Sequence, residues 1–213
     1  MKENGYEYVD LGLPSGTMWA TCNVGATKPE DEGLLFQFGR VDGYKYGDKN
    51  HKFRTNKQNK QDTGSEYIPL TTSGNTYDKG TTLNLEDDAA HVNMGGQWRI
   101  PTKDQLEELY DNTTHNVVVV NGVQGMMYAS NINGNKLFIP FMQGGWYNGI
   151  WEDVDRSYVR VWSSQVHTSY VNDAYRLSCY LRGYAINSYN TRSCTFTVRG
   201  VFIPNCNNIN MLI

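Results

Sequence analysis

The residues of this 213-residue chain that could carry chemistry are its cysteines, its histidines and one short acidic stretch. A structural zinc site or a redox pair would need cysteines close together, as in a CxxC motif, and no such pair occurs. Cys179 and Cys194 could pair if they lay on neighbouring strands. We favour the alternative that all the cysteines are reduced and pack as small buried side chains. The four are Cys22, Cys179, Cys194 and Cys206.

The histidines and carboxylates give no better indication of catalysis. The four histidines are His51, His91, His115 and His167. None has a Ser or Cys partner in a recognisable motif, so activation of a nucleophile is not predicted. Glu152, Asp153 and Asp155 could offer oxygen ligands to a hard cation, but we favour a solvated acidic loop. We therefore expect a protein that is not an enzyme, with no catalytic residue, no bound metal and no cofactor.

The composition between Ser163 and Ser193 suits a contact surface instead. These 31 residues include six Ser, five Tyr and three Asn, with four charged residues and no Lys or Glu. Tyr offers a large amphipathic contact at a low entropy cost, and Ser and Asn adapt their hydrogen bonds. Arg adds planar, bidentate and stacking contacts. The segment therefore indicates recognition of a ligand more than catalysis.

Strand alternation divides the residues from 174 onward into two faces. The inward face, which can join a core, has Tyr175, Leu177, Cys179 and Leu181. The outward face has Arg176, Ser178, Tyr180, Arg182 and Tyr184. We predict that the outward face binds a ligand together with nearby loop residues. Those loop residues are Trp146, Tyr147, Asn148, Trp151, His167, Tyr170, Asn172, Tyr189 and Asn190. The alternative is that these side chains coat a β-surface or pack beneath an insertion.

The overall composition limits the partners. Hydrophobic residues make up 39% of the chain and charged residues 19%, and the net charge is −3. This charge gives no strong attraction to nucleic acid or to an anionic membrane, so neither is expected as a partner. No apolar run approaches the length of a membrane span, and no export segment is visible after Met1. We expect a protein that is used without secretion or membrane insertion; the alternative is that an export segment has been removed.

The elements that must position these residues follow a mixed pattern. Short strands are expected within 6–24, and helices within 85–96 and 101–112. Thr102 and Gln105 match a capping box at the start of the second helix. After residue 116 the chain becomes rich in strands, with Asn-Gly dipeptides that favour hairpin turns. This order of elements predicts an α+β fold with antiparallel sheets.

The length of the chain suits one domain. We place this domain at 1–204, with a surface insertion at about 45–80 and a tail at 205–213. The insertion begins with a Lys-, Asn- and Gln-rich stretch that has no helical or strand period, and we therefore interpret it as a solvated loop. The tail ends in the apolar residues Met211, Leu212 and Ile213. We expect it to dock on a partner subunit, and the alternative is a frayed end or an intrachain strand.

Four stretches resemble a known family: YVDLGLPSGTMWATCNVGA at 8–26, EDDAAHVNMGGQWRIPTKDQLEEL at 86–109, VWSS at 161–164 and NTRSCTFTVRGV at 190–201. Together they are similar to the major paralogous domain first noted in Fibrobacter succinogenes, which is abundant in gut Bacteroidetes and their phages. The resemblance covers nearly the whole chain apart from the insertion and the tail. It implies a C-type-lectin-like fold, shared with formylglycine-generating enzymes and with the variable proteins of diversity-generating retroelements.

The chain lacks the residues that carry chemistry in relatives of this fold. Calcium-dependent lectins of the fold use Glu-Pro-Asn or Gln-Pro-Asp with Trp-Asn-Asp, and none of these triplets is present. Formylglycine-generating relatives use a close pair of C-terminal cysteines with copper. Cys179 and Cys194 are surrounded by Ser and Thr instead of an acid–base set, so that activity is not transferred. Gly200 also stands where family members usually have Pro.

The resemblance implies a recognition domain, which we expect in a phage virion as a fibre or decoration protein. It would bind a host-surface glycan or protein ligand and would contact other virion subunits, and an oligomer is expected because fibres favour closed symmetric assemblies. One alternative is a bacterial cell-surface or fimbria-associated binding protein. Another is a structural virion protein whose sheet face is buried against a permanent partner.

Overall fold

The computed structural model describes residues 1–48, 71–147, 150–180 and 183–204, with side chains left out at 146–156 and 183–187. The described chain is mostly antiparallel β-sheet with two short α-helices, so the predicted α+β mixture is confirmed. None of the helices in these ranges has the length and apolar character required to cross a bilayer. Most of the predicted insertion and the whole tail at 205–213 lie outside the described residues.

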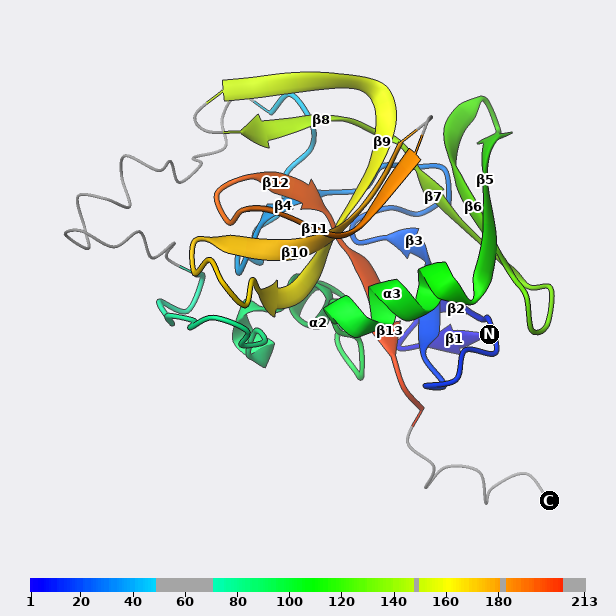
Figure 1. Cartoon of the computed structure of the whole chain (residues 1–213), viewed down its shortest axis with the longest axis horizontal. Helices are drawn as coiled ribbons and strands as arrows, with labels where there is room; N and C mark the ends of the chain where they lie inside the picture. The colour runs from blue at the N-terminus through cyan, green and yellow to red at the C-terminus, as the bar shows by residue number, and fades with distance from the viewer. Residues whose placement is uncertain (49–70, 148–149, 181–182, 205–213) are drawn as a thin grey trace.

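The first sheet joins the two ends of the described chain. Its strand order is β1-β2-β3-β13 with antiparallel pairing, and Figure 1 shows the blue and red strands side by side. Asn4 and Gly5 both have positive φ in the β1–β2 turn, the conformation that a type I′ hairpin requires. The strands are β1 (Lys2–Glu3), β2 (Tyr6–Asp10), β3 (Met18–Asn23) and β13 (Arg199–Phe202).

The central sheet carries most of the predicted binding residues. Its strand order is β11-β10-β9-β12-β4, and β8 also pairs with β9. The β12–β9 pairing is parallel, and the other pairings are antiparallel. In Figure 1, β9 is the long yellow strand that curves from β8 towards β10. The strands are β4 (Leu35–Gln37), β8 (Met142–Tyr147), β9 (Ile150–Val166), β10 (Asp173–Tyr180), β11 (Gly183–Thr191) and β12 (Thr195–Thr197).

The third sheet is an antiparallel meander of β5 (Thr113–Val120), β6 (Val123–Ser130) and β7 (Lys136–Pro140). Asn121 and Gly122 join β5 to β6, with φ values of 48° and 83°. Both values are positive, as the type I′ turn needs, so the predicted hairpin is confirmed. The second Asn-Gly pair, at 133–134, lies in the longer turn between β6 and β7.

Two short helices connect the first strands to the meander. The predicted helix at 85–96 consists of a 3₁₀ turn, η1 (Leu85–Asp87), followed by α2 (Ala89–Met94). The second helix is α3 (Lys103–Asp111), and Thr102 and Gln105 form the predicted capping box at its start. Leu106 and Leu109 are its buried residues. Because α3 contacts β9, β10 and β11, it covers one face of the central sheet.

Two hydrophobic cores lie on opposite faces of this sheet. Val161 and Trp162 are neighbours in β9 and therefore point to opposite faces. Val161 packs with Leu109, Tyr128 and Leu177 in one core. Trp162 belongs to the other, which also contains Phe36, Phe38, Trp98 and Phe196. The middle of this sheet is therefore buried on both faces.

A buried arginine links the first and third sheets. Arg199 in β13 is fully buried, and its guanidinium donates to the carbonyl of Ala20 in β3 at 3.0 Å and to that of Phe138 in β7 at 3.1 Å. Burial lowers the Arg199 pKa to about 10, against the opposing charges of Cys22 and Tyr128. The group still stays charged at neutral pH, because a planar guanidinium can satisfy several carbonyl groups at once.

The prediction of a surface insertion at about 45–80 is wrong near its C-terminal end, where side chains are buried. Thr71 and Tyr77 are buried, and Tyr77 belongs to the core around Trp162. Asp87, also buried, accepts hydrogen bonds from the Ser73 backbone and hydroxyl, from Asn75 and from the Tyr77 phenol, at 2.6–3.2 Å. Polar groups that bind a buried carboxylate look hydrophilic in a sequence, although they belong to the interior.

Burial raises the pKa of Asp87, but the hydrogen bonds from Ser73, Tyr77 and Asn75 outweigh burial and hold the pKa below its usual value. A carboxyl with a lowered pKa stabilises the fold above its ordinary pKa. This contribution disappears as the pH falls through the lowered value.

Asp87→Asn is expected to lower the free energy of unfolding by about 2–3 kcal/mol at neutral pH, because several donors lose a charged acceptor. The difference from the wild type should shrink in acid, where the wild-type carboxyl is also protonated. Urea unfolding at several pH values measures both effects. The matched control is Glu86→Gln, since Glu86 is an exposed neighbour whose carboxylate accepts from the Asn75 amide at 2.9 Å. Equal losses in the two variants would contradict the role of Asp87.

Candidate functional site

Three of the predicted binding residues come together in an aromatic cluster at the β9–β10 turn. The His167 ring is stacked on Tyr170, with centroids 4.9 Å apart and planes at 23°. It also lies 4.7 Å from Tyr175 and 4.3 Å from Tyr189. Tyr170 and Tyr189 are 5.7 Å apart. We call His167, Tyr170, Tyr175 and Tyr189 the tyrosine cluster.

Backbone pairing brings these residues together from three segments. Tyr175 in β10 and Tyr189 in β11 are register partners, so their side chains lie on the same face. The loop between β9 and β10 is closed by hydrogen bonds from His167 N to Asp173 O at 2.9 Å and from Asp173 N to Tyr170 O at 3.0 Å. The cluster therefore sits where two hairpins of the central sheet meet.

Side chains fix the loop further. The Nδ1 atom of His167 accepts hydrogen bonds from the backbone N–H groups of Ser169 at 3.0 Å and Tyr170 at 3.2 Å. The Thr168 hydroxyl and the Tyr175 phenol are 2.8 Å apart and share a hydrogen bond. These contacts order the Tyr170 backbone before any ligand arrives, which reduces the entropy cost of binding.

The cluster has a buried base and an exposed rim. His167 and Tyr175 are 9% and 7% exposed, whereas Tyr170 and Tyr189 are 53% and 43% exposed. Two large rings thus face solvent beside each other while their undersides are supported by packed aromatic groups. Such amphipathic rings can cover an apolar surface and still offer a hydroxyl to a ligand.

Burial lowers the pKa of His167, although the charge of Asp173 opposes this shift. Burial conversely raises the pKa of Asp173, and His167 opposes that shift. The His167 ring is therefore neutral at neutral pH and packs as an aromatic group. The Nδ1 atom of His167 is occupied by two backbone N–H groups and not by a hydroxyl or thiol that it could activate.

The residues predicted to form the outward face of β10 differ in their exposure to solvent. Tyr180 is 39% exposed and lies 5.9 Å from Tyr158. Arg176 is half-buried, with its guanidinium 5.0 Å above the Phe196 ring. Ser178 is only 6% exposed, so the prediction that it is displayed to solvent is wrong. The physical reason is that this face continues into the core around Trp162, the register partner of Arg176.

The predicted residues therefore do not share one face. Tyr189 is opposite Tyr175 and lies on the α3 side of the sheet, whereas Asn190 is opposite Ala174 on the other side. β10 is irregular on both edges around Arg176: its register shifts against β9 between Ala174 and Arg176, and against β11 between Arg176 and Ser178. A register shift of this kind changes which residues of paired strands share a face.

Two of the three predicted asparagines, Asn172 and Asn190, support the turns. The Asn172 backbone carbonyl accepts from Arg192 N at 2.9 Å. The Asn190 side-chain oxygen accepts from Thr191 N and from the Cys194 thiol. Both residues are half-buried. They hold the base of the cluster in place, which is a structural role next to the exposed rings.

The remaining predicted residues cannot be placed. Asn148 and Arg182 lie outside the described residues. The backbones of Trp146, Tyr147, Trp151 and Tyr184 are described, but their side chains are not. Trp146 pairs with Trp151 in the β8–β9 hairpin, and Tyr184 pairs with Cys179 in the β10–β11 hairpin.

Sequence reasoning missed the supporting residues. Tyr175 was assigned to the core, and it is buried, but it also forms the base of the cluster. Tyr158 and Arg160 in β9 were not included, although the Arg160 guanidinium lies 4.4 Å above the Tyr158 ring, next to Tyr180. The alternation of Tyr158, Arg160 and Trp162 along one strand was the available signal.

The cysteines offer no assembled chemical centre in the described chain. In the described structure, Cys22, Cys179 and Cys194 are thiols and not disulfides. The alternative that Cys179 and Cys194 pair is wrong, because they belong to the two different cores. Burial raises the pKa of the Cys179 thiol, which is 3.1 Å from the Tyr128 hydroxyl. Within the described ranges, no three His, Cys, Asp or Glu residues gather as metal ligands do.

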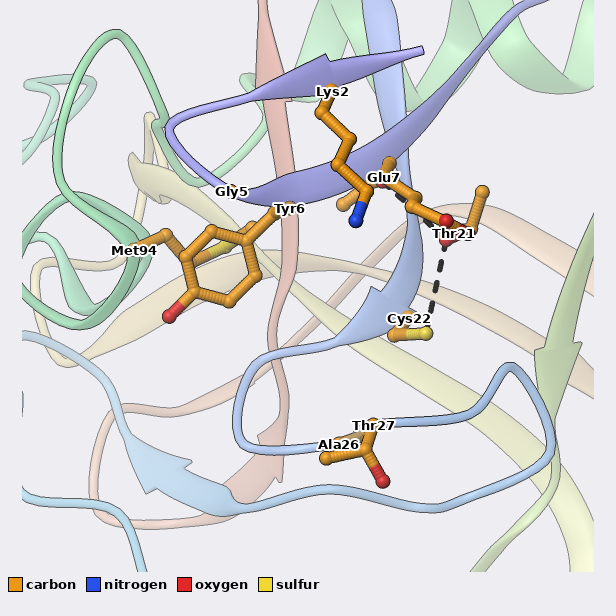
Figure 2. Close-up of a pocket in the computed structure, with 10 residues that line it drawn as sticks. Lys2, Gly5, Tyr6, Glu7, Thr21, Cys22, Ala26, Thr27 and Met94 are labelled. Atoms are coloured by element: carbon orange, nitrogen blue, oxygen red, sulfur yellow. Dashed lines mark hydrogen bonds between the residues drawn. The ribbon is translucent and has the colours of Figure 1, made fainter.

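A pocket of about 330 Å³ lies elsewhere, on the first sheet. Figure 2 shows Lys2, Tyr6 and Glu7 around it, together with Cys22 and Met94. None of the predicted binding residues lines it. It combines charged groups with a half-buried thiol, but nothing else in its lining points to a particular ligand, so the tyrosine cluster is the stronger candidate.

Replacing the exposed and buried members of the cluster should have different effects on stability. We expect Tyr175→Ala to lower the free energy of unfolding by about 3 kcal/mol, because it removes a buried ring. Tyr170→Ala and Tyr189→Ala should each cost less than about 1 kcal/mol, since both rings are half-exposed. Thermal and urea unfolding measure these values. Similar losses in all three variants would show that the exposed rings are structural.

Comparison with known proteins identifies no relative of this chain. No family model matches the chain, and neither a curated protein nor a solved structure matches it. Among the described residues, the tyrosine cluster is the arrangement that best fits recognition.

Proposed function

We propose that this chain is a recognition domain that binds its ligand without changing it chemically. The observation that carries the proposal is the pair of half-exposed rings, Tyr170 and Tyr189, held on a buried base of His167 and Tyr175. Aromatic rings fixed in this way are typical anchors of binding surfaces, where a few central residues supply most of the affinity.

The surroundings of the rings suit a ligand that has both an apolar face and hydroxyl or amide groups. The half-buried Asp173 follows the same loop, at the start of β10, and its carboxyl interacts with His167. Hydroxyl and amide groups of Thr168 and Asn172 flank the same turn. A pyranose ring or a polar peptide has this combination of an apolar surface with hydrogen-bonding edges.

The proposal also includes a C-type-lectin-like fold and a setting in a phage virion, where the domain binds a ligand on the host surface. A bacterial cell surface is the alternative setting. The support for both the fold and the setting is the resemblance of the four sequence stretches, together with the antiparallel sheets and the two short helices. Oligomerisation and contacts with other virion subunits belong to the same proposal.

Binding to an array of defined glycans and to intact gut Bacteroidetes cells tests the function. The double variant Tyr170→Ala, Tyr189→Ala should bind at least roughly thirtyfold more weakly than the wild type, since the loss of even one anchor costs about 2 kcal/mol. The matched control is Tyr6→Ala, because Tyr6 is 38% exposed but lies on the first sheet. Absence of binding by the wild type, or equal binding by the wild type and the double variant, would contradict the proposal.

A further inference from the structure

His167 holds the Tyr170 loop through a nitrogen that must be unprotonated. Two backbone N–H groups, from Ser169 and Tyr170, point at Nδ1 at 3.0 and 3.2 Å. A nitrogen accepts a hydrogen bond only through its lone pair, so the proton of the neutral ring is on Nε2. The side chain thereby acts as the acceptor of a local turn, in the way that an Asn or Asp side chain does in an Asx turn.

A second proton on this ring can go only to Nδ1. This proton would occupy the Nδ1 lone pair, so both hydrogen bonds would be lost. The new Nδ1–H group would then face the N–H groups of Ser169 and Tyr170, and the three donors would repel one another. The ring cannot shift freely to relieve this contact, because it is packed between Tyr170, Tyr175 and Tyr189. Protonation and the closed loop are therefore incompatible.

The charged and titratable neighbours of the ring do not all act in one direction. Asp173, the first residue of β10, is the carboxyl that interacts with His167, and its charge favours the protonated ring. The groups facing the ring from β10 and β11 are the phenols of Tyr175 and Tyr189, and Tyr170 stacks on it from the loop. On α3, the Lys103 ammonium lies 5.6 Å from the Tyr175 ring centre and is paired with Glu107 at 2.9 Å. Release of the loop in acid therefore depends on the loss of the two hydrogen bonds at Nδ1, which must outweigh the attraction to Asp173.

We propose that His167 is a pH-sensitive lock on the recognition surface: its neutral ring fixes the exposed Tyr170 ring beside Tyr189, and acid releases it. His167 is a positioning residue in this scheme, since it acts on a ligand only through Tyr170. The use of the lock to capture and release a ligand rests on the proposed function, but the lock itself is a property of the free protein.

The direction of the pH effect follows from the sign of the pKa shift. Burial lowers the pKa of His167 below its ordinary value of 6.5, with Asp173 opposing. The neutral ring therefore stabilises the closed loop fully above pH 6.5, and this contribution is lost as the pH falls through the lowered value. As the pH falls from 6.5 towards the lowered pKa, the fraction of molecules with an open loop rises by up to about tenfold per pH unit.

Hydrogen exchange of single amides, measured by NMR between about pH 7.5 and pH 4.5, tests the lock without any ligand. After correction for the intrinsic exchange rate, the Ser169 and Tyr170 amides should lose protection in acid by roughly tenfold or more. The Val24 amide, which donates to Val198 O at 2.9 Å on another sheet, is the internal reference and should not respond. A nitrogen-detected spectrum should show Nδ1 unprotonated at neutral pH.

His167→Asn is the matched variant, because its side-chain oxygen can accept the same two N–H groups and does not titrate. It should keep both amides protected across the whole pH range. His167→Ala should leave them unprotected at every pH. Equal acid sensitivity in the wild type and in His167→Asn, or a proton on Nδ1 at neutral pH, would overturn the lock. Unchanged ligand binding in the double variant Tyr170→Ala, Tyr189→Ala would overturn the proposed function and leave the lock standing.

Discussion

The fold depends on the burial of both faces of the central sheet. α3 and the third sheet cover the face of Val161, Leu177 and Cys179, and the core around Trp162 covers the other. Where a strand is enclosed in this way, a Lys or Glu side chain would take its charge out of water. The absence of these residues from β10 is therefore explained in part by burial, and among the described side chains the exposed aromatic rings of the cluster lie where the sheet ends.

This constraint also locates the candidate site. The hairpin turn after β9 and the last residues of β11 project beyond the covered region, and Tyr170 and Tyr189 are exposed there. Tyr175 belongs to the same strand face as Leu177 but lies at its margin, where core packing passes into the aromatic cluster. The rigid sheet thus supplies a fixed base for a surface that is itself formed by turns, the usual division between scaffold and binding residues.

Helix caps and turns could be predicted from the sequence where all the residues that form them lie in one short stretch. The capping box of Thr102 and Gln105 and the turn at Asn121 are examples, because the side chains that form them are neighbours in the chain. The inward positions of Leu177 and Cys179 followed from alternation. The burial of Ser178 did not, since alternation gives the two faces of a strand but not what covers each face.

Long-range polar contacts escaped prediction for a related reason. Asp87 and Arg199 are fully buried, and their partners lie on other segments, so their sequence context resembles that of exposed residues. The tyrosine cluster was found in part: His167, Tyr170 and Tyr189 were named. Asn190 and Arg176 lie on the other face of the sheet, because Asn190 is adjacent to Tyr189 in β11 and Arg176 is adjacent to Tyr175 in β10. The pairing of Tyr175 with Tyr189, which builds the cluster, depends on two strands and has no signature in one strand alone.

The separation of the two cores has a consequence for how the chain reaches its native state. Cys179 and Cys194 are buried in different cores, on either side of the same sheet, and both are thiols in the described structure. No oxidase is needed to join them, and air cannot link them while the sheet remains intact. For this pair of thiols, the described fold can therefore form during synthesis in a reducing cell and survive later exposure to oxygen without covalent change.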